Sequence, residues 1–218
     1  MYNAKDNQEL NKPTIEPTVD GPYLVKNLAD FKNSRGESIA AKPEMFLCRC
    51  GGSANKPFCD GTHLRIGFSG DKSEDRVPDR LEHYTGQEIT IHDNRGACSH
   101  AGYCTDNSPA VFRMKSEPWI DPDADDAGKT AKTIKMCPSG ALSYTKGKIL
   151  YKDQQRAPAI TVSKDGPYRA VGGPELKDPA GNRPESQEHY ALCRCGASKN
   201  KPFCSGQHWY AGFKDDKN

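Results

Sequence analysis

Short runs of apolar residues alternate with long polar stretches along this chain of 218 residues. Residues 23–25 follow an Asp-Gly-Pro turn and residues 45–47 lead into a cysteine-rich turn, so both runs predict short strands. Alternating and β-branched residues predict a further strand over 88–92, and residues 148–151 are expected to be its partner. Pairing of these two strands would bring the ends of the intervening segment together, as an inserted domain requires.

The polar stretches between these runs predict loops and linkers. Residues 1–12 carry few apolar side chains and are expected to be disordered, and residues 32–43 are expected to form a loop. Residues 71–80 are highly charged and contain a proline, as is typical of a linker. A brief helix or turn is expected after His63, ending at Gly67.

One stretch of sixteen residues occurs twice, at an offset of 145 positions. It reads CRCGGSANKPFCDGTH at 48–63 and CRCGASKNKPFCSGQH at 193–208. The same offset also aligns the Asp-Gly-Pro-Tyr segments at 20–23 and 165–168 without a gap. The chain therefore contains a duplicated module of roughly 60 residues, with a different segment inserted between the two copies.

Each copy of the repeat carries four residues that can bind metal. Cys48 and Cys50 lie on one tight turn and could share a metal ion, while Cys59 and His63 are four residues apart at a turn into a helix. The second copy repeats these four ligands as Cys193, Cys195, Cys204 and His208. Three cysteines and one histidine also suit structural zinc, although zinc usually takes its ligands from more widely spaced pairs than Cys-x-Cys.

The repeated stretch resembles the signature of the CDGSH iron-sulfur proteins, the mitoNEET-type family. The first copy also has the expected Ser53, Pro57 and Asp60, whereas the second has Ser205 in place of that aspartate and Gln207 in place of a small hydroxyl residue. The resemblance implies that each module binds one 2Fe-2S cluster through its three cysteines and its histidine. Modules of this family come together in pairs, so the tandem copies imply an intramolecular pseudo-dimer.

The inserted segment contains three further cysteines, Cys98, Cys104 and Cys137, of which the last precedes a proline. This pattern resembles a divergent single-cluster bacterial ferredoxin in which Ala101 occupies the position of one ligand. The resemblance favours a 3Fe-4S cluster, with a 4Fe-4S cluster as the alternative. In that alternative the fourth iron would be bound by His100 or by a water-derived ligand. A third interpretation is three buried cysteines without a cluster.

These patterns predict an α+β fold of small, β-rich modules. We expect CDGSH modules over residues 13–72 and 155–218, forming the pseudo-dimer, and an inserted ferredoxin-like α+β domain over residues 84–152. The apolar fraction of 34% and the mean hydropathy of −0.85 argue against a single large core. Small domains of this kind usually need bound metal for stability.

Composition and charge narrow the setting in which the protein works. Nine cysteines are an odd number, which argues against a closed disulfide framework and favours a reducing compartment. Residues 1–16 are too polar for a signal peptide, and no apolar run reaches the length of a membrane span. A cytoplasmic protein without membrane association is expected. The net charge of +2 gives no reason to expect nucleic-acid binding.

The expected function is electron transfer or redox sensing with a separate redox partner protein. The sequence contains no dinucleotide fingerprint and no phosphate-binding loop, so an electron carrier is expected and not an enzyme with its own substrate pocket. The alternative is a cluster carrier or stress sensor that donates 2Fe-2S clusters to apo-proteins. A monomer is expected, with a homodimer as the alternative. Because Asp60 adds a negative charge that Ser205 lacks, the second module's cluster is expected to be the easier one to reduce.

Overall fold

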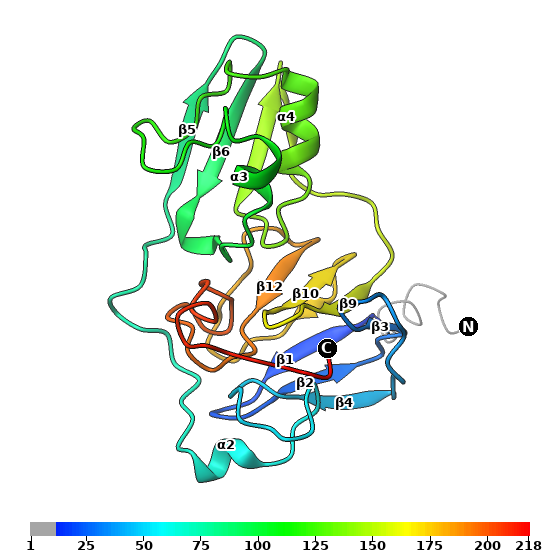
Figure 1. The fold of residues 1–218 in the computed structure, drawn as a ribbon. Coiled ribbons are helices and arrows are strands. Elements are labelled where there is room, and N and C mark those ends of the chain that lie inside the picture. Colours follow the sequence, from blue (N-terminus) through cyan, green and yellow to red (C-terminus); the bar gives the residue numbers. More distant parts are fainter. Residues whose placement is uncertain (1–11) are drawn as a thin grey trace, which may run out of the picture.

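The computed structural model describes residues 12–218 and arranges them as two lobes (Figure 1). The lower lobe in that view contains both copies of the repeat, and the upper lobe contains the inserted segment. Residues 1–11, which make up nearly all of the stretch expected to be disordered, lie outside the described residues. Among the described residues, no helix combines the length and the apolar character needed to cross a membrane.

The first sheet of the lower lobe has the strand order β11-β1-β2-β4. Three of its strands belong to the first copy of the repeat: β1 (Thr14–Pro17), β2 (Tyr23–Lys26) and β4 (Glu44–Leu47). The strands predicted at 23–25 and 45–47 are therefore confirmed. The fourth strand, β11 (Glu175–Leu176), comes from the second copy and lies parallel to β1.

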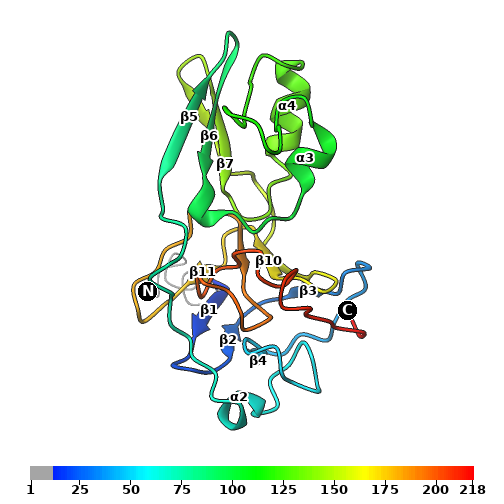
Figure 2. The same ribbon diagram turned by 60° about the vertical axis from the view of Figure 1, so that its left-hand side comes forward.

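The second sheet repeats this arrangement with the roles of the two copies reversed. Its order is β12-β10-β9-β3, with β9 (Ala159–Val162), β10 (Tyr168–Val171) and β12 (Tyr190–Leu192) from the second copy. The strand β3 (Asp30–Lys32) comes from the first copy and lies parallel to β9. Each copy therefore completes the sheet of the other, and the two sheets lie next to each other in both views (Figure 2).

A single hydrophobic core joins the two sheets. It contains Tyr23 and Tyr168, whose rings meet edge to face with their centroids 6.1 Å apart. The other fully buried members come about equally from the two copies and include Ile15, Val25, Phe31, Leu47, Ile160, Val162 and Leu192. Burying each large apolar side chain stabilises the fold by about 1.5–3 kcal/mol. Because the core is shared, that stabilisation depends on both copies being present.

The inserted segment forms a separate lobe, which we call the middle domain (residues 81–151). Its antiparallel sheet has the order β5-β6-β7-β8, formed by β5 (Leu81–Thr85), β6 (Ile89–Asn94), β7 (Leu142–Lys146) and β8 (Ile149–Tyr151). The short helix η1 (Arg95–Ala97) follows β6, and α3 (Tyr103–Asn107) and α4 (Ala127–Ile134) lie together on one side of the sheet (Figure 2).

The expected pairing of residues 88–92 with residues 148–151 is wrong. Residues 88–92 fall largely in β6, which pairs with β5 and β7, whereas β8 pairs with β7 alone. The physical reason is the two-residue turn between β7 and β8, where Gly147 adopts a positive φ of 62° and closes a tight hairpin. The first strand of this sheet, β5, begins at Leu81, where a linker gives way to the domain.

Candidate iron-sulfur sites

The first copy of the repeat places its four predicted ligands as two pairs, which together we call the first-module site. The Sγ atoms of Cys48 and Cys50 are 3.8 Å apart, just beyond the end of β4. Cys59 Sγ lies 3.4 Å from Nδ1 of His63, on the short helix α2 (Thr62–Arg65), which begins one residue before His63, whereas the sequence predicted its start after His63. Two sulfurs bound tetrahedrally to one metal at about 2.3 Å are about 3.8 Å apart, so the cysteine pair fits one metal atom.

The second-module site has the same geometry. The Sγ atoms of Cys193 and Cys195 are 3.8 Å apart, and Cys204 Sγ lies 3.5 Å from Nδ1 of His208. Among residues 12–218, no three or more His, Cys, Asp or Glu side chains gather into a group that could hold one metal ion. The structure thus brings the predicted ligands together as pairs, two in each module.

Backbone N–H groups point at the cysteine sulfurs of both sites. The N–H of Gly52 donates to Cys50 Sγ, and the N–H of Gly61 donates to Cys59 Sγ, each at 3.4 Å. In the second module, the N–H of Gly206 donates to Cys204 Sγ at the same distance. Hydrogen bonds to ligand sulfur stabilise thiolate charge and are one determinant of iron-sulfur reduction potentials. The donor set and its surroundings therefore fit an iron-sulfur cluster.

A hydrogen bond between the two sulfurs lowers the pKa of one thiol in each close cysteine pair. The Cys48 thiol donates to Cys50 and lowers the pKa of Cys50 to about 6. In the second module the Cys195 thiol donates to Cys193 and lowers the pKa of Cys193 to about 6. The lowered pKa falls on the second cysteine of one pair and on the first cysteine of the other. It therefore belongs to the hydrogen-bonded pair as a whole and not to one fixed position. Metal binding needs both thiolates, and each pair supplies the first one near neutral pH.

A tyrosine of each module holds the ligand loop of the other. The Tyr23 hydroxyl donates to the carbonyl oxygens of Cys193, at 2.9 Å, and Pro202, at 2.8 Å. The Tyr168 hydroxyl donates to the carbonyl oxygens of Cys48 and Pro57, both at 2.9 Å. Burial raises the pKa of both tyrosines, so both remain protonated donors. Each metal site is therefore positioned partly by the opposite module.

The arginine inside each Cys-Arg-Cys sequence is buried, but the two have different partners. Arg49 donates to two carbonyl oxygens, those of Thr18 at 2.9 Å and Gly70 at 2.7 Å. Arg194 likewise donates to two carbonyl oxygens and, in addition, forms an ion pair with the buried carboxylate of Asp215. The positive charge beside the second-module site is thus neutralised, while that beside the first-module site faces carbonyl dipoles and aromatic rings.

Asp60 and Ser205 occupy equivalent places and cap equivalent loops. Asp60 accepts hydrogen bonds from the N–H groups of Ala54, at 2.9 Å, and Thr62, at 3.0 Å. Hydrogen bonds from Thr62 and Ala54 hold the pKa of Asp60 well below its usual value. In the second module, Ser205 Oγ accepts from the N–H of Lys199 at 3.2 Å. The serine therefore retains one capping contact without adding a charge.

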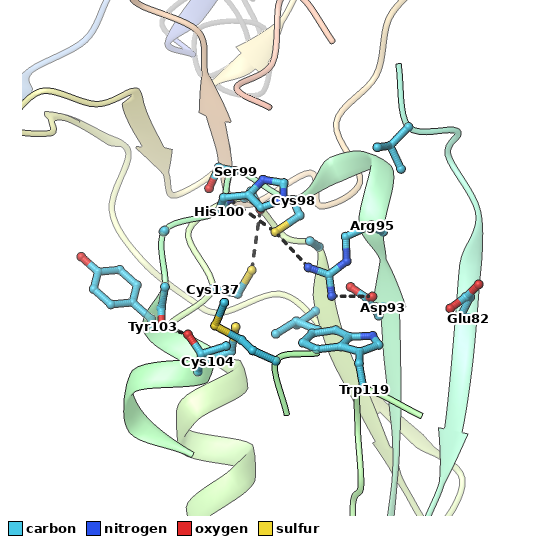
Figure 3. Close-up of a pocket in the computed structure, with 18 of the residues that line it drawn as sticks. Glu82, Asp93, Arg95, Cys98, Ser99, His100, Tyr103, Cys104, Trp119 and Cys137 are labelled. Atoms are coloured by element: carbon cyan, nitrogen blue, oxygen red, sulfur yellow. Dashed lines mark hydrogen bonds and ion pairs between the residues drawn. The ribbon is translucent and has the colours of Figure 1, made fainter. Parts of the chain in front are cut away.

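The three cysteines of the middle domain line one cavity of about 910 Å³ (Figure 3). Cys98 follows η1, Cys104 lies in α3, and Cys137 follows α4. We call this cavity the middle site. The N–H of His100 donates to Cys98 Sγ at 3.4 Å, and burial raises the pKa of the Cys98 thiol to about 12.

A cationic side chain that the sequence patterns did not reveal lies beside the middle site. The Arg95 guanidinium is 3.9 Å from the centroid of the Trp119 ring, and its Nη1 donates to Cys98 Sγ at 3.6 Å. It also pairs with buried Asp93 at 3.1 Å. Burial raises the pKa of Asp93 to about 6. In the sequence, only the position of Arg95, three residues before Cys98, indicates that this arginine could lie near the middle site.

The structure places the side chain of His100, the alternative fourth ligand, against the second module. A side-chain carbon at Gly206 would come within 2.8 Å of His100 Nδ1, and the ring also interacts with the backbone of Ser205. His100 itself adopts a positive φ of 55°. The imidazole thus lies where the two lobes meet, at the rim of the middle site.

Comparison with known protein families finds a match for each of the three segments of the chain. The family described as "Iron-binding zinc finger CDGSH type" matches residues 20–64 and again residues 165–209. The family described as "Divergent 4Fe-4S mono-cluster" matches residues 84–147, between the two.

Two curated relatives, both called "Uncharacterized protein YjdI", come from Escherichia coli strains K12 and O157:H7. Each is 43% identical to this chain over 61 residues, which is 28% of this chain and 80% of the relative. No solved structure matches the chain. The protein is thus a member of the CDGSH-type iron-binding family, with two CDGSH modules on either side of a divergent 4Fe-4S mono-cluster domain.

Proposed function

We propose that the protein is an electron-transfer or redox-sensing protein that carries three iron-sulfur clusters. The two modules would each hold a 2Fe-2S cluster through three cysteines and one histidine, and the middle site would hold the third cluster. When bound, such clusters accept and release single electrons. The observation that carries the proposal is that one chain positions three sets of sulfur donors. In the two modules, the cysteine pairs have the same geometry, and backbone N–H groups donate to cysteine sulfurs.

For the middle site we propose a 4Fe-4S cluster on Cys98, Cys104 and Cys137. The description of the matching family favours this alternative over the 3Fe-4S cluster that the missing ligand at Ala101 suggests. The contact between the His100 ring and Gly206 favours a water-derived ligand for the fourth iron over His100. Arg95 would lie beside Cys98 and offset part of the negative charge of the thiolates.

We also propose that the two modules act as an intramolecular pseudo-dimer within a monomeric protein. The exchange of β3 and β11 and the reciprocal hydrogen bonds of Tyr23 and Tyr168 support this. The nine cysteines, all of them free thiols, support a reducing compartment such as the cytoplasm. The partner would be a redox protein, and we propose neither nucleic-acid nor membrane binding nor catalysis on a separate substrate.

The decisive experiment is anaerobic purification with iron and sulfide analysis, followed by EPR before and after reduction with dithionite. Two 2Fe-2S clusters and one 4Fe-4S cluster require about eight irons and eight sulfides per chain. A 3Fe-4S signal in the oxidised protein would correct the assignment of the middle site. Stoichiometric zinc in a colourless protein would overturn the proposal for the modules.

A second function, donation of 2Fe-2S clusters to apo-proteins, is favoured by one observation. Cys59 and His63 are only partly buried, so an acceptor protein could reach the first-module site. The two functions differ in a transfer assay with an apo-ferredoxin. Rapid stoichiometric loss of one cluster without electron flow would favour the carrier. Retention of all clusters during repeated reduction and oxidation would favour the electron-transfer protein.

A further inference from the structure

Among residues 12–218, the hydrogen bonds between the middle domain and the two modules all lead to the second module. The backbone and side chains of the middle domain take part at several points around one interface. These bonds are Asn200 Nδ2 to Gly96 O at 3.0 Å, Arg169 Nη1 to Tyr103 Oη at 2.9 Å, Asn94 Nδ2 to Glu185 Oε2 at 2.7 Å and Trp209 Nε1 to His100 O at 3.2 Å. Each of them leads to the second module, so the middle site lies against the second-module site.

The closest approach between the two sites is the segment 98–100. Cys98 is a donor of the middle site, and the carbonyl oxygen of the next residue, Ser99, lies 4.0 Å from Sγ of Cys204, a donor of the second-module site. The Ser99 side chain is buried, and its hydroxyl has no hydrogen-bond partner among the described residues. One residue and one van der Waals contact therefore separate sulfur donors of the two sites.

The two module sites also meet each other, through the turns that follow their cysteine pairs. A side-chain carbon at Gly51 would lie 2.5 Å from the carbonyl oxygen of Cys195, and one at Gly196 would collide with the carbonyl oxygen of Cys50. The backbones are thus in direct contact here. The three sites form a series in which the second-module site is in the middle.

Solvent exposure differs along this series. The second-module ligands Cys204 and His208 are 2% and 5% exposed, and they lie near the covering segment 98–100. The corresponding ligands of the first module, Cys59 and His63, are only partly buried. In the cysteine pairs, Cys50 is buried and Cys195 is half-buried, so the first-module site is the more open of the two on its cysteine–histidine side, where a protein in solution can approach it.

We infer that segment 98–100 is a redox bridge, a stretch of chain through which electrons pass between the middle site and the second-module site. The second-module site is then an internal relay, and the first-module site exchanges electrons with the partner protein. The inference rests on the proposed electron-transfer function. In each internal step one electron leaves a reduced site and enters its oxidised neighbour, without bond formation or proton transfer, and a one-electron redox protein supplies or removes the net electron. Electron tunnelling falls steeply with distance, so bonded segments and van der Waals contacts between sites favour this order.

The test is EPR on the fully loaded, dithionite-reduced protein, with iron and sulfide counted in the same sample. A nearby paramagnetic centre speeds relaxation, so the second-module signal should require higher microwave power to saturate than the first-module signal. The variants His63→Cys and His208→Cys assign the two signals, because each shifts the signal of its own site. Replacing Cys98, Cys104 and Cys137 with alanine should make the two signals saturate alike.

A chelator challenge of the loaded protein tests the covering of the second-module site without depending on the triple variant. In the wild type, the first-module signal should be lost roughly tenfold faster than the second, because release from a covered site requires local opening. The double variant His100→Ala, Trp209→Ala should speed loss of the second-module signal.

Leu64→Ala is the matched control for the chelator challenge, since Leu64 is the counterpart of Trp209 and is 80% exposed. It should leave the second-module rate unchanged. Equal saturation and equal loss rates for both module signals, with all three clusters present, would overturn the bridge. Absence of the clusters themselves would instead overturn the proposed function.

Discussion

The two CDGSH modules have the same ligands, the same pairing distances and the same strand order, yet their sites lie in different surroundings. The second-module site is covered by the middle domain and has a neutralised arginine, whereas the first-module site is partly open and has an arginine without a carboxylate partner. Ligand identity sets which cluster can bind. The comparison teaches that neighbouring residues determine which of two identical ligand sets is accessible and which is electrostatically neutral.

This comparison reverses the expectation, drawn from the sequence, that the second module's cluster is the easier one to reduce. That expectation depends on Asp60, whose charge is fully exposed and therefore strongly screened by solvent and salt. Asp215 carries its charge in the interior, at 5% exposure, and corresponds to Gly70 in the first module. Burial also disfavours the additional negative charge of a reduced cluster. We therefore expect the second-module site to be the harder of the two to reduce.

The largest expected effect comes from removing the carboxylate partner of Arg194, so that Arg194 resembles Arg49. Asp215→Asn leaves the buried Arg194 without a counter-charge, and breaking a buried ion pair on one side typically costs about 3–5 kcal/mol of stability. The reduction potential of the second-module site should rise at the same time. Denaturant unfolding and a redox titration of the loaded variant measure the two effects. An unchanged potential would show that Asp215 does not influence this site.

The next largest effect tests the reciprocal tyrosines, where the two modules should behave alike. Tyr23→Phe and Tyr168→Phe each remove the hydroxyl donor from one cysteine carbonyl, that of Cys193 or of Cys48, at a cost of about 1–3 kcal/mol, while the proline carbonyl beside it keeps a backbone N–H donor. Each variant should also loosen the site of the opposite module. Chelator-driven loss, followed separately by EPR for each site, should therefore accelerate at the second-module site in Tyr23→Phe and at the first-module site in Tyr168→Phe. Acceleration at the tyrosine's own module would contradict the assignment.

A smaller difference is expected on acidification. Burial lowers the pKa of His208, so its neutral, metal-binding form persists to lower pH, and a proton displaces it less readily. His63 is more open to solvent. As the pH falls from about 7 to about 5, across the range in which imidazoles usually titrate, the first-module signal should disappear before the second. His63→Cys serves as the control and should remove this order, because the first-module site then has no histidine ligand.

The smallest effect is expected from exchanging the exposed caps. Asp60→Ser should raise the potential of the first-module site slightly, and Ser205→Asp should lower that of the second. Because Asp60 is exposed, the first shift should shrink further at high ionic strength. Potentials measured at low and at high salt test this. A large shift that does not depend on salt would mean that the cap changes the structure of the ligand loop.

The sequence predicted the ligands and much of the local structure, because both depend on short-range patterns. The offset of 145 residues located eight candidate ligands, which the structure places in pairs, and apolar runs located β2, β4 and β6. The exchanged strands were not predictable in this way. Residues 30–32 and 175–176 are too short for a periodic signal, and their parallel pairing depends on tertiary contacts. The partner of Arg194 was hidden for the same reason, since Asp215 is distant in sequence.

Strand exchange within one chain has a consequence for the behaviour of the protein on dilution. Two separate modules that completed each other's sheets would dissociate at low concentration, and their ligand loops would lose the tyrosines that hold them. Here the connecting residues keep the modules at a high effective concentration however few molecules are present. Occupancy of the two module sites should therefore be independent of protein concentration, which would suit a carrier that a cell keeps at low abundance.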